Sequence, residues 1–162
     1  MKYAASIDAS IDHFLTVRQV LEWVENTMPF SDYISDKGAS NGVGAHSRYY
    51  PGEWGFKTCR EYLDKADIKG KRKAFDDILE HHSPAFRFFF VERFGRCPQA
   101  WYNAKKKYSR SVAVSSFVGH VLGIGDRHGS NILIHRGTGE VVHIDFGIVF
   151  EQGKVSRVSP LW

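Results

Sequence analysis

Three polar residues near the C-terminal end of the chain have the types and the spacing that phosphoryl transfer requires. Asp126 precedes Asn131 by five positions, and Asp145 follows as the first residue of an Asp-Phe-Gly sequence. Phosphoryl transfer needs a carboxylate that accepts the proton of the attacking group, and oxygen ligands that hold magnesium against the phosphates. We therefore predict that Asp126 is the catalytic base and that Asn131 and Asp145 bind the metal.

The sequence around these residues predicts how they come together. Segment 123–131 contains three glycines, which permit backbone angles that other residues resist, so a compact loop is expected. Residues 132–134 and 141–144 are short apolar runs rich in β-branched residues, and the six residues between them include two glycines. They predict a β-hairpin that brings Asp145 back beside Asn131.

Helices are predicted over 71–82, 84–94 and 98–122. Pro84 suits the first turn of the second helix, and the phenylalanines at 86, 89, 90 and 94 predict a stripe that faces the core. The third helix should be buried and deliver the loop at a fixed place, with Gly119 and Gly123 at its end or packed closely on a neighbour. Upstream, a strand is expected over 17–24, the start of a short helix over 30–34 and an exposed loop over 36–48.

Composition excludes several classes of protein. The 162 residues carry a net charge of +4, and the basic residues are spread along the chain, so direct sequence-specific nucleic-acid binding is not expected. The only cysteines, Cys59 and Cys97, are far apart, which argues against a disulfide framework. No apolar run approaches the ~18 residues of a membrane span, so a soluble protein without a membrane partner is expected.

Two motifs resemble a known family. Gly-Asp-Arg-His-x-x-Asn at 125–131 and His-Ile-Asp-Phe-Gly at 143–147 resemble the phosphatidylinositol 3-kinase superfamily, which comprises lipid kinases and large related protein kinases. Other stretches are similar to its ataxia-telangiectasia-mutated (ATM) group, namely 21–29, 44–49, 84–89, 108–113 and 150–154. The resemblance covers about residues 18 to 154.

The resemblance implies an α+β fold: the large lobe of a PI3/PI4-kinase-type, protein-kinase-like domain, mostly helical, with a short β-hairpin that carries the metal-binding Asp and with the small lobe missing. It divides residues 1–162 into a hinge region (18–30), a loop (36–48), a helical core (71–122), a catalytic loop (123–131), the hairpin with Asp-Phe-Gly (132–147) and a truncated activation segment (148–162).

The resemblance also implies roles and cofactors. His128 would stabilise charge on the transferring phosphate, next to Asp126 as the base. The cofactors would be ATP and magnesium, with manganese as a substitute. Adenine would be held by a hinge segment, where Trp23 stacks on it, and by an opposite apolar wall; the residues concerned are Glu22, Trp23 and Val24, then Leu133 and Ile144.

The implied activity is that of an ATM-like serine/threonine protein kinase in the DNA-damage response and telomere maintenance. Its partners would be protein substrates, at Ser/Thr-Gln sites, and the remainder of the kinase chain; its location would be the nucleus, with the cytoplasm as the alternative. Because no phosphate-covering loop or small-lobe lysine can be placed in 1–20, we expect a fragment that is inactive alone. The alternatives are a phosphatidylinositol kinase, for which Lys154 and Arg157 offer few basic residues, and a non-catalytic truncated binding module.

Overall fold

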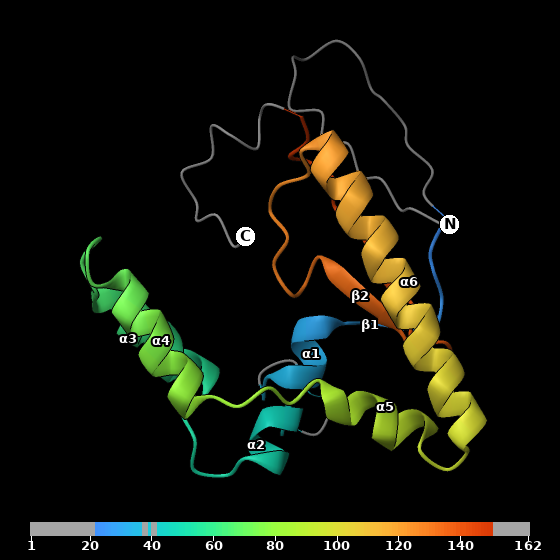
Figure 1. The fold of residues 1–162 in the computed structure, drawn as a ribbon, viewed down its shortest axis with the longest axis horizontal. Helices are drawn as coiled ribbons and strands as arrows, with labels where there is room; N and C mark the ends of the chain where they lie inside the picture. Colours follow the sequence, from blue (N-terminus) through green and yellow to red (C-terminus); the bar gives the residue numbers. More distant parts are fainter. Residues whose placement is uncertain (1–21, 37–38, 40–41, 151–162) are drawn as a thin grey trace.

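The computed structural model describes residues 22–36, 39 and 42–150, and this part of the chain is mostly helical with one small antiparallel sheet (Figure 1). The α+β class predicted from the sequence is confirmed. The elements, in chain order, are β1 (Thr27–Pro29), α1 (Phe30–Ile34), α2 (Ala45–Tyr49), α3 (Phe56–Lys65), α4 (Lys71–His81), α5 (Arg87–Phe94), α6 (Pro98–Leu122), β2 (Ile132–His135) and β3 (Val141–His143).

The sheet has the order β1-β2-β3, and the predicted hairpin is its β2–β3 pair. The prediction of a strand over 17–24 is wrong for residues 22–24, which form no strand. Residues 17–21 lie outside the described residues. A turn follows instead, in which Thr27 donates its hydroxyl to the carbonyl of Val24 (3.0 Å) and Asn26 has a φ of 56°. The strand therefore begins at Thr27, and Pro29 is tolerated in it because β1 is an edge strand.

The core lies between the sheet and helices α1, α2, α5 and α6. Phe89 and Phe90 of α5 are buried, and so is Ile134 of β2. Tyr33 of α1 packs edge-on against Phe89, with ring centroids 5.3 Å apart, a favourable geometry for aromatic pairs. The core-facing phenylalanine stripe predicted for this helix is confirmed.

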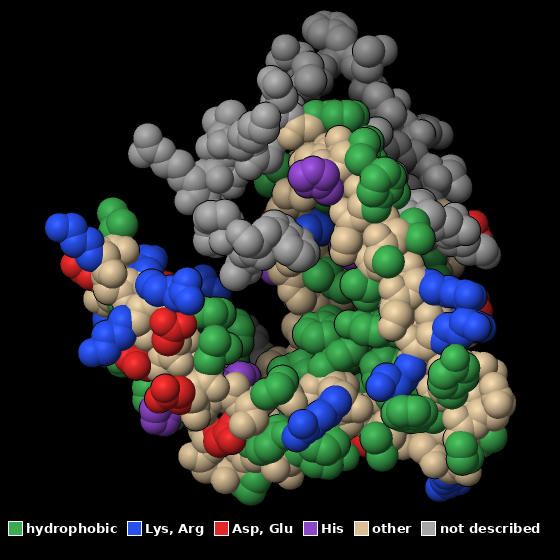
Figure 2. All heavy atoms as spheres, in the orientation of Figure 1, with side chains coloured by type: hydrophobic (Ala, Val, Ile, Leu, Met, Phe, Trp, Pro, Cys, Tyr) green, Lys and Arg blue, Asp and Glu red, His purple; other side chains and the backbone are tan. Residues whose placement is uncertain are grey.

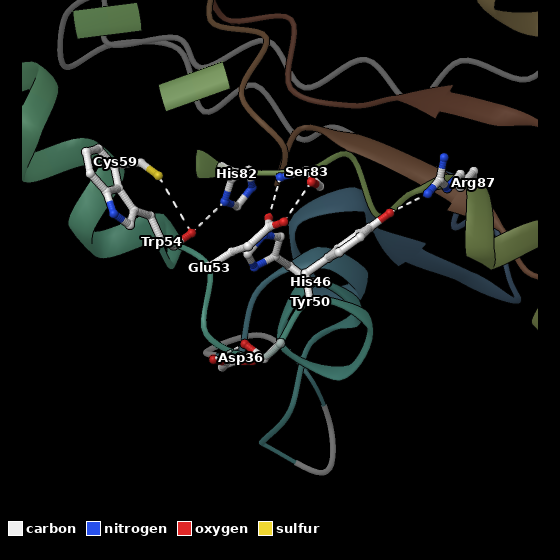
Figure 3. A network of polar contacts seen from close by, with 10 residues as sticks. Asp36, His46, Tyr50, Glu53, Trp54, Cys59, His82, Ser83 and Arg87 are labelled. Atoms are coloured by element: carbon white, nitrogen blue, oxygen red, sulfur yellow. Dashed lines mark hydrogen bonds and ion pairs between the residues drawn. The ribbon is translucent and has the colours of Figure 1, made fainter. Parts of the chain in front are cut away.

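The start of α5 differs from the prediction, because the helix begins at Arg87 rather than at Pro84. Figure 3 shows the reason: the Glu53 carboxylate accepts hydrogen bonds from both the backbone N–H (2.6 Å) and the hydroxyl (2.8 Å) of Ser83. Ala85 is then buried before the first turn forms. These contacts, to a residue thirty positions away, hold 83–85 outside the helix.

Two further helices were not predicted. The prediction of a loop over 36–48 is wrong from Ala45 onward, because α2 begins there. Asp36 anchors this short helix by accepting hydrogen bonds from the Gly44 N–H (2.7 Å) and the Ser47 hydroxyl (2.8 Å). Helix α3 pairs with α4 in an arm at one side of the molecule (Figure 1). Side chains of both charges cover this arm (Figure 2).

Helix α6 has the predicted bounds, but much of its surface is not buried. Ala104 and Ser115 face the interior, whereas Phe117 is 70% and Val121 62% exposed. Among the described residues, no atom lies within 4 Å of a β-carbon built at Gly119, so this glycine serves no close contact with the described helices. None of the helices in the described ranges is long and apolar enough to cross a bilayer.

Candidate active site

The loop 123–131 is fixed at its start by the end of α6. Gly123 has a φ of 58°, and the N–H groups of Gly123 and Ile124 donate to the carbonyls of His120 (3.3 Å) and Gly119 (2.9 Å). This pattern is a Schellman motif, and glycine is favoured at its left-handed position because it has no β-carbon. The helix end thus sets the direction in which the loop leaves, as the sequence predicted for Gly123.

Helix α1 holds the middle of the same loop. The Ser31 N–H donates to the carbonyl of Gly129 (3.0 Å), and the hydroxyls of Ser31 and Ser130 are 3.2 Å apart. A β-carbon on Gly129 would lie 3.2 Å from that of Ser31, so α1 lies directly against the loop. The loop is therefore supported from two elements that are far apart in the sequence.

Three of the predicted site residues meet in this loop. The carboxylate of Asp126 lies 3.9 Å from Nε2 of His128, and about half of each side chain is exposed. Asn131 is buried, and its side-chain N–H donates to the backbone carbonyl of Asp126 (3.0 Å). The loop consequently presents a carboxylate and an imidazole to the outside while a buried amide braces it from within.

The hairpin brings the fourth predicted residue back to the loop. The Ile144 N–H donates to the carbonyl of Asn131 (3.0 Å), which extends the β2–β3 pairing by one step. Asp145 follows with a φ of 57°, and its carboxylate accepts a hydrogen bond from the Gly147 N–H (3.3 Å). The predicted return of Asp145 toward Asn131 is therefore observed in the backbone.

The donor chemistry of Asn131 and Asp145 fits a magnesium ion. Because the Asn131 amide nitrogen is directed at the carbonyl of Asp126, its oxygen is the end directed away from that bond. Amide and carboxylate oxygens are ligands that magnesium accepts, and this ion usually keeps several waters and substrate phosphate oxygens as well. Within the described ranges no three His, Cys, Asp or Glu side chains form a closed metal cage.

Sequence reasoning gave no role to Arg127, which connects the loop to the Asp-Phe-Gly segment. Its Nε donates to the carbonyl of Gly125 (2.8 Å), and its two terminal nitrogens donate to the carbonyls of Ile144 (2.7 Å) and Asp145. Burial lowers the pKa of the guanidinium, while the charges of Asp126 and Asp145 act in the opposite direction. The only sequence signal was its position inside the Asp-Arg-His triplet.

His143, the last residue of β3, lies close to this arginine. Burial lowers the pKa of its imidazole, and the positive charge of Arg127 lowers it further. The neutral imidazole is therefore the favoured form in the folded protein.

Only part of the predicted adenine-binding set lines the cavity beside the hinge segment in the described residues. Glu22, Trp23 and Val24 line an open cavity of about 960 Å³ together with β3 and the side of α6 that carries Arg110. Leu133 and Ile144 do not line it.

Leu133 nevertheless has a position that suits a wall. It pairs in register with Val142, and direct partners across a strand pair have side chains on the same face. The neighbouring Ile134 belongs to the core on the other face. Leu133 and Val142 thus share one face of the hairpin; Val142 lines the cavity, whereas Leu133 is itself buried, at 5% exposure.

Comparisons with known proteins agree with the motifs. The family described as phosphatidylinositol 3- and 4-kinase matches residues 10–160. The chain is 49% identical over 134 residues to the serine/threonine-protein kinase ATM of Arabidopsis thaliana (83% of this chain, 3% of that protein) and 44% identical over 138 residues to the serine/threonine-protein kinase tel1 of Schizosaccharomyces pombe (83% and 5%). The solved FAT and kinase domain of CtTel1 is similar with a TM-score of 0.76 and 38% identity, over 87% of this chain and 10% of that one. The chain therefore spans a small part of the length of these relatives.

Proposed function

Because the chain belongs to the phosphatidylinositol 3- and 4-kinase family, we propose that it supplies the catalytic loop and the metal-binding Asp of a serine/threonine protein kinase. Kinases of this kind use ATP with a divalent metal ion. The observation that carries the proposal is the meeting of Asp126, His128 and Asn131 in one braced loop, with Asp145 returned to it by the hairpin. Since the chain spans 3% to 5% of the first curated relatives, the activity is that of a longer polypeptide.

Each side chain then has a defined task. Asp126 accepts the proton of the attacking hydroxyl, and His128, 3.9 Å from it, stabilises negative charge on the phosphate that is transferred. Asn131 and Asp145 would hold magnesium, or manganese in its place. The metal would supply positive charge that offsets the negative charge of the ATP phosphates.

The nucleotide base is proposed to lie between the hinge segment and the hairpin. Trp23, which is 78% exposed here, would stack on adenine, and Glu22 and Val24 would offer backbone groups to it. Leu133 and Ile144 would form the wall beneath.

The acceptor is proposed to be a protein hydroxyl rather than a lipid. The similar proteins from plant and yeast are named serine/threonine-protein kinases, and identity of 44% to 49% supports a shared class of acceptor. Serine or threonine followed by glutamine, in proteins of the DNA-damage response and telomere maintenance in the nucleus, is the proposed target. A phosphatidylinositol acceptor and a non-catalytic binding role are the alternatives.

The test uses the complete polypeptide that contains these residues, with radiolabelled ATP and magnesium. We expect transfer to a Ser-Gln peptide, little transfer to its Ala-Gln counterpart, and little to phosphatidylinositol vesicles. Asp126→Asn should lower kcat by at least about 100-fold, in the range found for removal of a general base. Asp64→Asn is the matched control, because this carboxylate lies on the exposed α3 and pairs only with Arg60 at 3.8 Å among the described residues.

Equal activity of wild type and Asp126→Asn would refute the assigned role, and transfer to lipid alone would favour the lipid kinase. Residues 1–162 by themselves should show no measurable turnover. A turnover of this segment that Asp145→Asn abolishes would contradict that expectation.

A further inference from the structure

The Arg127 side chain joins the two segments that carry the proposed catalytic groups. All three of its guanidinium nitrogens donate to backbone carbonyls: Gly125 in its own loop, and Ile144 and Asp145 at the turn after β3. The guanidinium carbon also lies 5.3 Å from the ring centroid of Phe146, a cation–π distance. One side chain therefore contacts three consecutive residues, Ile144, Asp145 and Phe146, at the turn on which Asp145 is presented.

That turn needs an external support. Asp145 has a φ of 57°, a left-handed conformation that residues with a β-carbon adopt at a cost of about 1 kcal/mol or more. The two carbonyls that Arg127 holds belong to Asp145 and to the residue before it, so they fix the orientation of the strained peptide units. Backbone bonds from Gly125 to Ile148 (2.9 Å) and from Phe150 to Leu122 (2.7 Å) join the same segments but do not contact the turn itself.

The geometry points to Arg127 as a positioning residue that sets the orientation of the Asp145 carboxylate relative to Asp126. This inference rests on the proposed function, in which Asp145 is a metal ligand. A guanidinium is suited to the task because it presents donors in a rigid, planar fork, whereas a lysine ammonium is a point charge on a flexible stem. Lysine at 127 would keep the positive charge between the two aspartates but lose the simultaneous bonds to Gly125, Ile144 and Asp145.

The experiment compares Arg127→Ala and Arg127→Lys with wild type in the complete polypeptide. The measured quantities are kcat, KM for ATP and the magnesium concentration that gives half-maximal rate. Removing a group that orients a metal ligand typically costs 10- to 100-fold in metal affinity or activity. We therefore expect the half-saturating magnesium concentration to rise about tenfold and kcat to fall about 100-fold in Arg127→Ala, with partial recovery by millimolar guanidinium ion.

Arg127→Lys should show most of the same defect, since charge alone does not hold the turn. Arg136→Ala is the matched control: this arginine lies exposed in the β2–β3 turn and should leave both values within about twofold of wild type. A purely structural role would lower the active fraction, and so kcat, without moving the magnesium dependence.

An unchanged magnesium dependence in Arg127→Ala overturns the inference, however much activity remains. Failure of both Arg127 variants to fold also overturns it, because Arg127 would then be a stability residue. Failure of the proposed function has a different signature: activity that survives Asp126→Asn. If Asp126→Asn abolishes activity while Arg127→Ala leaves kcat and the magnesium dependence unchanged, only the positioning role of Arg127 is contradicted.

Discussion

Replacing Gly44 by alanine should destabilise the protein, because the backbone at the end of α1 lies directly against this residue. A β-carbon at Gly44 would lie 2.3 Å from the carbonyl oxygen of Ile34 and 2.5 Å from the carbonyl carbon of Ser35. Both atoms belong to the main chain, so no side-chain rotation relieves the overlap. Helices α1 and α2 would have to move apart.

The size of the effect follows from two opposing terms. Overpacking costs about 1–3 kcal/mol, and the upper end applies here because main chain must move. Alanine restricts the unfolded chain more than glycine does, which returns about 0.4–1 kcal/mol. The net loss is about 2 kcal/mol, or a fall in Tm of about 4–8 °C for a chain of 162 residues.

Gly55 provides a matched control. It precedes α3 as Gly44 precedes α2, with φ −73° and ψ 163° against φ −73° and ψ 167°. In the part of the chain that the structure describes, no atom lies within 4 Å of a β-carbon built at Gly55. Gly55→Ala should therefore stay within about 0.5 kcal/mol of wild type, because the weaker helix cap and the restricted unfolded chain nearly cancel.

The assay is thermal unfolding followed by circular dichroism, with urea unfolding as a check. A second readout is amide exchange of Ser31, whose N–H bonds Gly129 in the candidate catalytic loop and should exchange faster in Gly44→Ala. Equal Tm values for Gly44→Ala and Gly55→Ala would show that α1 and α2 adapt without cost. The close approach of the α1 backbone to Gly44 would then not limit stability.

Two further predictions concern the core and the pH dependence. Phe89→Ala removes a ring that is 1% exposed and should lower the free energy of unfolding in urea by about 3–5 kcal/mol. Phe117→Ala, at a position that is 70% exposed, should change it by no more than about 0.5 kcal/mol. Similar losses of stability in the two variants would place Phe89 outside the core. The His143 pKa is lowered in the folded protein, so below pH 6.5 the unfolded chain takes up the proton first and stability falls as the pH decreases toward the folded pKa. Between pH 7.5 and 5 the Tm of wild type should therefore fall more than that of His143→Gln, and parallel curves would contradict this.

The parts of the structure that the sequence predicted well are those with a local cause. Helix α6 has the predicted bounds because Pro98 suits its first turn and Gly123 its left-handed end. The hairpin was found because β-branched runs flank a glycine-containing turn. The compact course of the loop 123–131 was predicted because three glycines lie in this segment.

The errors have long-range causes. Helix α5 begins late because Ser83 is bonded to Glu53, and no periodic pattern reports such a contact. Arg127 was overlooked because its partners are backbone carbonyls, which carry no sequence signal. The adenine residues were assigned by resemblance, and the separate places of Trp23 and Leu133 leave that assignment as a proposal.

The candidate site also explains why so many contacts converge on two short turns. Gly123, Asp126 and Asp145 all have left-handed backbones, with φ of 58°, 52° and 57°, but glycine occupies only the first. At the other two positions glycine would relieve strain of about 1 kcal/mol or more and would remove the carboxylate that the proposed chemistry needs. The strain must then be offset by hydrogen bonds from side chains of other residues. At Asp126 the Asn131 amide provides such a bond, and at Asp145 the Arg127 guanidinium does, so the residues that orient the two carboxylates are also those that make their conformations tolerable.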